Sequence, residues 1–501
     1  MEAILTDGFK MISPTTRPDT AECAAIVPAA TTVPVAAIAA PARPSVRRRR
    51  AITTIFLFAF AILFALLPLV ATAAEPPGEP RVLTLDQALE IASEKNRDIL
   101  KARQYVNLVR GKYEEERAGA LPTFSLNGNA GVMQDKTTLI FPGMGSDKQQ
   151  VYWGGVSVTQ TLFTWGKLGA AMRAAKEGFS LAEEQLRLYR QAAFRDVSIA
   201  FFDVLLTRQL HLIAKENHAQ KERHFHEASR RRDAGVATDY DVLAASVAVE
   251  NARPDVIRSE NQIRDARHRL GFLLAINGEA GRDLDVTGAL ESVDIPVIPD
   301  YEAVYKTALA RRPDLHDLRH RIKIARELVN VADADDKPRL EFKGEYGWKW
   351  LETGDLNLDG RQWNAGLFFT FPFFDGLLTR GKVAQAESEL RGIKIDEEKL
   401  ADSVSLQSHE ALNAVRESKE IVDALSGTVA QAEKLLYLSE KGYELGVKIR
   451  LEVEDAELKL QQARGNFLRA WRDYRAALVN LQWVMGVLDF PISQFMTDSE
   501  S

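Results

Sequence analysis

The sequence feature that most constrains the fold is an internal duplication. Four segments of the first half of the chain match four segments of the second half, in the same order. The matching pairs are 92–103 with 308–319, 121–128 with 337–344, 151–166 with 361–376, and 234–243 with 445–454. A repeat of this length indicates two copies of one supersecondary unit that pack against each other. Each copy predicts the order helix, strand, loop, strand, long helix, tight turn, helix.

The duplication divides the chain into a predicted series of parts. The two structural repeats form its main body, and a linker joins them. The expected parts are a disordered or mis-started extension at 1–46, a signal peptide at 47–74, the first repeat at 83–278, the linker at 279–300, the second repeat at 301–486 and a tail at 487–501.

The helix predictions rest on apolar residues that alternate three and four positions apart. In the last helix of each repeat these positions form a heptad seam. The seam residues are Leu460, Ala463, Phe467, Ala470, Tyr474, Ala477 and Leu481 in the second repeat, and Val249, Ala252, Val256, Ser259, Ile263, Ala266 and Leu270 in the first. Small residues at alternate positions allow close helix packing, either in a coiled-coil wall or in an ordinary helical bundle.

Helix lengths distinguish these two architectures. The helical patterns from Leu168 to Arg232 and from about Leu377 to Glu444 each predict a helix roughly 100 Å long, at 1.5 Å per residue. The helices that flank the first of them, near Leu85 to Ala118 and Thr238 to Ile276, are each about half as long. Two half-length helices placed end to end match one long helix. We therefore expect a long α-helical coiled-coil barrel, an elongated rather than a globular structure.

Strand-like alternation interrupts the helices, most clearly in RLEFKGEYGWKW at 339–350. From Leu340 onward every second residue is apolar or glycine, and most of the residues between them are charged. This pattern places aromatic side chains on one face of a strand and charged side chains on the other. Related patterns occur at 123–132, 152–162 and 363–371, so we expect four strands per chain.

These strands fit a membrane barrel better than a soluble sheet. A strand of about 10 to 12 residues spans about 35 Å, close to the apolar thickness of a bilayer once the strand is tilted. An apolar outer face and a polar inner face are typical of transmembrane strands around a wet lumen, whereas a soluble sandwich turns its apolar face inward and has more strands. Four strands cannot close a barrel, and lipid does not tolerate an open sheet edge, so other copies of the chain must pair with the edges. Three chains would close 12 strands, although the spacing permits other multiples.

The region before the first repeat carries an export signal. Four arginines at 47–50 precede a run of roughly 20 apolar residues, and Ala71 and Ala73 form an A-x-A end. The alternative interpretation of this run is an uncleaved membrane anchor. The only cysteine, Cys23, lies upstream, so no disulfide framework is expected. A net charge of −6 leaves no basic surplus for phosphate contacts and argues against nucleic-acid binding.

The duplicated unit, preceded by an export signal, resembles the TolC-like outer-membrane efflux protein family. The likeness extends from Leu83 to about Gly486 and is carried by RRPDLHDLR, FPFFDG and the two turn segments AGVATDYDV and LGVKIRLEVED. The resemblance implies a mainly α protein with a membrane β-barrel. It would be a homotrimer whose 12-stranded barrel lies in outer-membrane lipid and whose helices form a long periplasmic tunnel. The resemblance also implies docking on a periplasmic adaptor protein and on an inner-membrane transporter that supplies the energy, with no cofactor.

The resemblance also indicates functional positions at the periplasmic end. The turns at Gly235 and Gly446 would be the ends of helical hairpins, because glycine permits a sharp reversal. The positions expected to contact adaptor hairpins are Ala234, Gly235, Val236, Leu445, Gly446 and Val447.

A latch is expected beside these turns. In the family an aspartate, a tyrosine and an arginine hold the entrance closed, and the matching positions are Asp241, Tyr443 and Lys448. Lysine lacks the planar fork of arginine, so we expect a less directional ion pair and a weaker latch. The alternative for Asp241 and Lys448 is a solvated surface pair worth under about 1 kcal/mol.

Two further acids, Glu452 and Asp455, match an acidic pair that faces the pore in the family. Six carboxylates from three chains would concentrate cations around a narrow opening and let multivalent cations block it. The alternative is local, because residues that follow a turn lie at a helix N-terminus, where carboxylates interact favourably with the helix dipole.

Two other classes of protein fit the sequence less well. An enzyme is not indicated, since the sequence holds no nucleophile elbow, phosphate-binding loop or HExxH motif. His218, Glu222 and His226 share one helical face, and a solvated surface explains them better than a metal site does. A periplasmic structural coiled-coil protein without channel activity is the alternative function, and the charges on one strand face argue against it. Drug, metal and protein exporters share the same duct, so no cargo is predicted.

Overall fold

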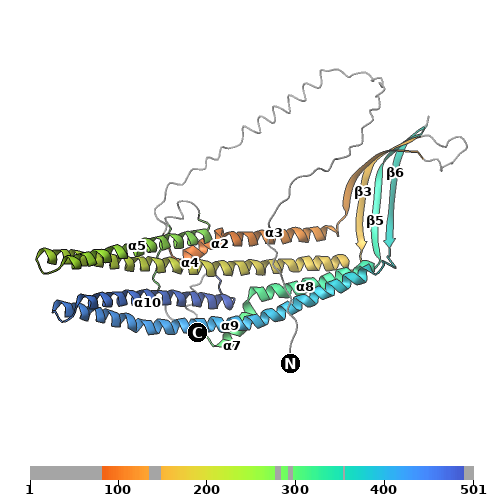
Figure 1. Ribbon diagram of the computed structural model, residues 1–501. Coiled ribbons are helices and arrows are strands. Elements are labelled where there is room, and N and C mark those ends of the chain that lie inside the picture. The colour runs from red at the N-terminus through yellow and green to blue at the C-terminus, as the bar shows by residue number, and fades with distance from the viewer. Residues whose placement is uncertain (1–81, 135–147, 277–283, 292–296, 354–355, 490–501) are drawn as a thin grey trace, which may run out of the picture. The chain divides into compact units, whose positions relative to one another are not determined.

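The structure is a computed structural model that describes residues 82–134, 148–276, 284–291, 297–353 and 356–489 of the chain (Figure 1). These residues belong to one unit, Glu75–Ser501. The predicted extension, the predicted signal peptide and most of the predicted tail lie outside the described residues.

The elements follow the same order in both halves of the chain. The first half contains β1 (Val82–Leu83), α2 (Leu85–Lys95), α3 (Arg97–Ala118), β2 (Thr123–Met133), β3 (Gln149–Phe163), α4 (Lys167–Asp233) and α5 (Asp239–Leu273). The second contains β4 (Asp285–Val286), α7 (Tyr301–Arg311), α8 (Pro313–Asp333), the 3-10 turn η1 (Ala334–Asp336), β5 (Arg339–Thr353), β6 (Leu356–Thr370), α9 (Leu378–Glu444) and α10 (Arg450–Val484). Helices α4 and α9 have 67 residues each, and α5 and α10 have 35 each. The long helices therefore extend about 100 Å, as predicted.

The prediction of one continuous helix near Leu85 to Ala118 was wrong, because a break at Asn96 separates α2 from α3. Asn96 has a non-helical backbone, and its side chain accepts hydrogen bonds from the N–H groups of Asp98 and Ile99. This is an N-cap, so a new helix begins there. The second half breaks at Arg312, where the following Pro313 disfavours a helical conformation in the residue before it.

Each long helix packs along the shorter helices of its own half. Helix α4 contacts α2, α3 and α5, and α9 contacts α7, α8 and α10 (Figure 1). Contacts of α4 with α8 and with α10 join the two halves. The paired starts of the halves, β1 and β4, form a short parallel sheet that adds a further connection.

The main core lies around the middle of α4. Phe194, Val197 and Phe201 of α4 are buried there with residues of α2, α5 and α10. Among the described helices α4 is long and apolar enough to cross a membrane by composition, but 44% of its apolar window is buried inside this structure. The predicted heptad seams are confirmed by their buried members, which are Ala252, Ser259, Ile263, Leu270, Leu460, Ala463, Ala470, Tyr474 and Leu481.

Four strands form one antiparallel sheet in the order β2–β3–β5–β6. The strand hairpin of the first half meets the strand hairpin of the second half where β3 pairs with β5. The fourth strand begins at Leu356, seven residues before the predicted start at Trp363. The edges of this sheet within the chain are β2 and β6.

Candidate functional site

The pairing register collects the apolar positions of all four strands on one face of the sheet. Residues paired across antiparallel strands point to the same side. Two apolar rows cross the sheet from β2 to β6, and they are Phe124, Val158, Gly344, Ala365 and Leu126, Val156, Tyr346, Trp363. Leu126 is 84% exposed and Trp363 is 72% exposed in the single chain. A contiguous apolar face of this kind indicates an apolar environment or a partner.

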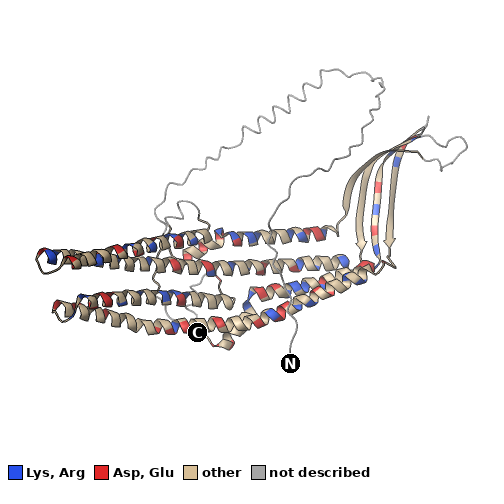
Figure 2. Ribbon diagram, in the orientation of Figure 1, with Lys and Arg blue, Asp and Glu red and all other residues tan. Residues whose placement is uncertain are grey.

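The opposite face of the sheet is polar, as the alternation predicts. One of its rows is Ser125, Ser157, Glu345 and Asn364, in which the amide of Asn364 donates to the carboxylate of Glu345 at 2.9 Å. Figure 2 shows that the charged residues of β5 alternate in sign along the strand. Lys343 and Glu341 on this strand lie 3.1 Å apart.

The far ends of the two helical hairpins are built alike. Gly235 and Gly446 have positive φ values of 74° and 71°, which glycine adopts without steric cost. In each turn a backbone N–H reaches back five residues, from Val236 to Arg231 and from Val447 to Gly442, which is the hydrogen-bond pattern of a helix C-cap.

All the predicted adaptor-contact residues are exposed at these turns, namely Ala234, Gly235, Val236, Leu445, Gly446 and Val447. Apolar side chains continue past each turn, since Tyr240 and Leu451 are also exposed. The tips therefore present apolar surface, and an adaptor contact there remains a prediction.

The structure gives each of the three predicted latch residues a separate partner within the chain. The carboxylate of Asp241 accepts hydrogen bonds from the N–H and the hydroxyl of Thr238, both at 2.8 Å. These bonds lower the pKa of Asp241 below its ordinary value. The ammonium of Lys448 lies 3.3 Å from the hydroxyl of Ser439 and 3.7 Å from Glu452.

The third latch residue, Tyr443, contacts an arginine that the sequence prediction missed. The guanidinium of Arg231, on α4, donates to the hydroxyl of Tyr443 at 2.6 Å and also lies over its ring. Arg231 is one of three consecutive arginines in the last turn of α4, and this basic cluster was the available signal. The contact joins α4 to α9 beside the tips.

The two predicted pore acids also have local partners. Glu452 accepts a hydrogen bond from the N–H of Ile449 at 3.1 Å and so caps the first turn of α10. Asp455 forms an ion pair with Lys459 one turn further on, at 2.6 Å. Glu452 and Asp241 are each the third residue of their helix and have the same capping role. The structure therefore shows Glu452 capping the N-terminus of α10, and an acidic ring that faces a pore remains a prediction.

A buried cluster between α4 and α10 was not predicted. The carboxylate of Glu457 is contacted by Gln220 at 2.5 Å, Lys221 at 2.7 Å and His224 at 2.6 Å. The Glu457 side chain is only 4% exposed. The sequence signal was weak, because Glu457 is one of three acids between the buried residues Val453 and Leu460, and spacing alone does not single it out.

The candidate histidine group does not form a metal site in this structure. His218 lies 3.7 Å from Glu222, and the ring of His226 lies beside that of Phe225. In the part of the chain that the structure describes, no three His, Cys, Asp or Glu side chains are placed to hold a metal ion.

A sheet with one apolar and one polar face, joined to two long helical hairpins of equal length, defines the class of outer-membrane channel proteins. The family described as outer membrane efflux protein matches residues 88–275 and 304–487, which cover most of both repeats. The chain belongs to the outer membrane efflux protein family. Membership makes it an outer-membrane channel protein of efflux or secretion with a long periplasmic helical portion.

Individual relatives agree with this assignment. Outer membrane protein OprJ of Pseudomonas aeruginosa is 25% identical over 408 residues, covering 80% of this chain and 84% of OprJ. Outer membrane protein TolC of Vibrio cholerae is 23% identical over 341 residues, which cover 67% of this chain and 76% of TolC. Among solved structures, the Campylobacter jejuni CmeC outer membrane channel superposes with a TM-score of 0.71 at 17% identity, covering 80% of this chain and 85% of CmeC.

Proposed function

We propose that the chain is the outer-membrane exit duct of a tripartite efflux or secretion system, which conducts substrates passively from an inner-membrane pump across the periplasm and the outer membrane. The observation that carries this proposal is the division of the sheet into an exposed apolar face and a polar face. Lipid suits the first face and a water-filled lumen suits the second.

Closure of the barrel requires more than one chain in this proposal. The edge strands β2 and β6 carry backbone groups that lipid cannot satisfy. In a homotrimer, β6 of one chain pairs with β2 of the next, and three sheets of four strands close a 12-stranded barrel. The polar rows of each sheet, including Glu345 and Asn364, then line the lumen.

The partners in this proposal dock at the hairpin tips. Exposed apolar residues at both turns, such as Val236 and Val447, suit the helical hairpins of a periplasmic adaptor. AprF of Pseudomonas aeruginosa, 26% identical over 344 residues, is named as an alkaline protease secretion protein, and OprJ and TolC are named as outer membrane proteins. Both efflux and secretion therefore remain within the proposed function.

The channel is tested by reconstituting the purified full chain in planar bilayers. We expect discrete single-channel currents from a detergent-extracted trimer. A chain that stays monomeric and soluble without detergent would instead support the alternative of a structural coiled-coil protein, and the channel proposal would be rejected.

The proposed gate is tested in the same bilayers. Lys448→Ala removes a cation beside the tip and is expected to raise the single-channel conductance, whereas an unchanged conductance would remove Lys448 from the latch. Replacing Glu452 and Asp455 together with alanine is expected to abolish block by trivalent cations. Persistent block would place the acidic ring elsewhere.

A further inference from the structure

The two helical hairpins of the chain, α4–α5 and α9–α10, are joined by polar contacts between α4 and α10. Three such contacts follow one another along the antiparallel pair of helices. They are Asp203 with Arg472, Glu216 with Arg464, and Glu457 with Gln220, Lys221 and His224. The Glu457 contact is the one of the three nearest to the tips.

The Glu457 contact is buried and has three donors. The side chain of Glu457 is 4% exposed, whereas that of Glu216 in the neighbouring contact is 69% exposed. One carboxylate oxygen accepts from Gln220 and His224, and the other accepts from Lys221. An ionised carboxylate can only accept, so Nε2 of His224 carries a proton in this arrangement.

The cluster keeps the carboxylate charged. Burial on its own would raise the pKa of Glu457, but the hydrogen bonds from His224 and Lys221 lower it below its ordinary value. A buried charge that loses its partner is strongly destabilising, whereas an exposed ion pair contributes little. Loss of a donor at Glu457 while α4 and α10 stay packed therefore costs more than loss of the exposed contact between Glu216 and Arg464.

The position of the cluster along the helices is symmetric. Glu457 lies 11 residues after Gly446, and His224 lies 11 residues before Gly235. Nearer the tips, the hairpins are joined by the partly exposed contact of Arg231 with Tyr443.

We propose that Glu457, with Gln220, Lys221 and His224, forms a buried clamp that fixes the point from which the two hairpin tips can separate. The clamp is a property of one chain. Its consequence, a limit on how wide the periplasmic entrance opens, rests on the proposed function.

Hydrogen–deuterium exchange of the full chain in detergent tests the clamp directly. Glu457→Gln keeps the side-chain shape but places an amide against three donors. We expect amides at 225–245 and 440–456 to exchange several-fold faster, while those at the middle of α4 stay unchanged. Unchanged exchange at the tips overturns the proposal.

The chain offers matched controls. Glu222→Gln removes an exposed acid whose ion pair with His218 stays within α4. His218 and His224 are both 23% exposed, so His218→Gln controls for His224→Gln. The proposal expects faster tip exchange in His224→Gln and not in either control. Equal acceleration in the controls would overturn it.

A double-mutant cycle covers the case in which Glu457→Gln alone fails to fold. Lys221→Met and Glu457→Gln act through one contact, so their effects on tip exchange should not add. If Glu457→Gln yields no folded protein, the same cycle is run with Lys221→Met and His224→Gln. Additive effects in the cycle that is run would contradict the clamp.

Single-channel recording separates the clamp from its consequence. Glu457→Gln is expected to raise the conductance of the reconstituted protein. Faster tip exchange with unchanged conductance would overturn the link to the entrance. A wild-type protein that forms no channels would overturn the proposed function, and the exchange result would still decide the clamp.

Discussion

The two repeats break their shorter helices at the same place but stabilise the break with different side chains. In the first repeat the residue at the break is Asn96, between α2 and α3. Its Oδ1 caps α3, and its Nδ2 donates to the carbonyl of Leu273 at the end of α5, at 2.9 Å. One short side chain therefore both begins a helix and holds the end of another.

In the second repeat the same position is Arg312, which does not cap its helix. Pro313 begins α8 and needs no cap for its missing N–H. The guanidinium of Arg312 instead binds Asp314 at 3.1 and 2.6 Å and donates to Gln407 of α9 at 2.7 Å. Arg312 and Asn96 are both buried.

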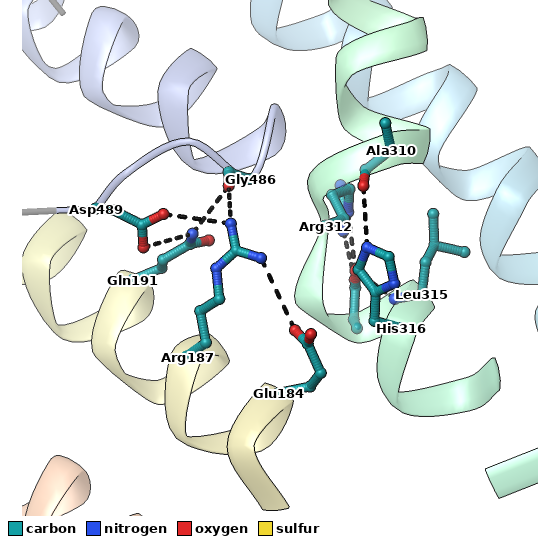
Figure 3. Close-up of polar contacts among 10 residues, drawn as sticks. Glu184, Arg187, Gln191, Ala310, Arg312, Leu315, His316, Gly486 and Asp489 are labelled. Carbon is teal, nitrogen blue, oxygen red and sulfur yellow. Dashed lines mark hydrogen bonds and ion pairs between the residues drawn. The ribbon is translucent and has the colours of Figure 1, made fainter. Parts of the chain in front are cut away.

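The ends of the last helices differ in a related way. Figure 3 shows the carbonyl of Gly486, after α10, accepting from Arg187 and Gln191 of α4, both of which also contact Asp489. A Cβ on Gly486 would lie 2.8 Å from the backbone of Arg311 and Arg312. In the first repeat the matching position, two residues past the helix end, is Ala275. The duplication thus preserves the backbone path, while side-chain contacts have diverged to fit each local partner.

The two strand hairpins, β2–β3 and β5–β6, also share a backbone arrangement but differ in their side chains. On the polar face, β2 and β3 carry uncharged residues such as Ser125 and Ser157, whereas β5 carries charges of alternating sign. The apolar face is continuous across both halves. The shared environment, proposed to be lipid, therefore constrains both repeats alike, and the polar face leaves each free to differ.

The largest expected effect comes from placing a charge on the apolar face of each repeat. An arginine at the bilayer midplane costs about 2–4 kcal/mol in a barrel. Leu367→Arg in β6 and Leu126→Arg in β2 are both expected to prevent membrane assembly, measured as the yield of detergent-extracted trimer. The control Asn364→Arg lies on the polar face and should assemble. Assembly of Leu126→Arg alone would show that the repeats do not share one environment.

A smaller effect is expected at the ends of α5 and α10. Gly486→Ala forces a left-handed alanine, with φ near 69°, against the backbone of Arg311. The backbone conformation alone costs about 1–3 kcal/mol, so the thermal unfolding midpoint should fall. The matched change Ala275→Gly, at φ 54°, should have an effect under about 1 kcal/mol. Equal effects would mean that the close contact at Gly486 is relieved by movement of α7 and α8.

Lowering the pH is expected to destabilise the contact of α4 with α8 before the contact of α4 with α3. Between α4 and α8, the hydrogen bond from His320 lowers the pKa of Glu177, and those from Arg173 lower the pKa of Glu327. A carboxylate whose pKa is lowered in the folded state stabilises the fold fully when the pH is above its ordinary pKa. This contribution is lost as the pH falls through the lowered pKa. The α3–α4 seam instead contains the apolar pair Tyr113 and Phe179.

Hydrogen exchange measured between pH 7 and pH 3.5 checks this order. Amides of α8 should lose protection at a higher pH than those of α3, after correction for intrinsic exchange. Glu177→Gln should reduce the difference between the two helices. A simultaneous loss in α3 and α8 would show that the ion pairs of the α4–α8 seam contribute nothing specific.

Periodicity was sufficient to predict the features that belong to a single helix or strand. The lengths of α4 and α9, the seams of α5 and α10 and the alternation of β5 all follow from spacing along the chain. The break at Asn96 was missed because it depends on a single cap inside an otherwise helical pattern. The first residues of β6 were missed because their alternation is out of phase with the rest of the strand, so that Leu358 lies on the polar face and Asp359 on the apolar face.

Contacts between elements could not be predicted in the same way. Arg231 meets Tyr443, and Glu457 meets His224, because of the rotation of one helix against another. Spacing along one helix does not determine that rotation, since many residues of α4 and α10 are charged. The resemblance supplied positions at the tips, but not the partners that these side chains have within the chain.

The smallest expected effect concerns the first turns of α5 and α10, whose N-cap residues differ. Thr238 accepts a hydrogen bond from the N–H of Asp241, whereas Ile449 at the matching position has no side-chain acceptor. Loss of a threonine N-cap costs about 1 kcal/mol. Thr238→Ala should therefore speed amide exchange in the first turn of α5, and Ile449→Thr should slow it in the first turn of α10. If Ile449→Thr has no effect, the bond between Glu452 and the N–H of Ile449 already provides all the capping that this turn uses.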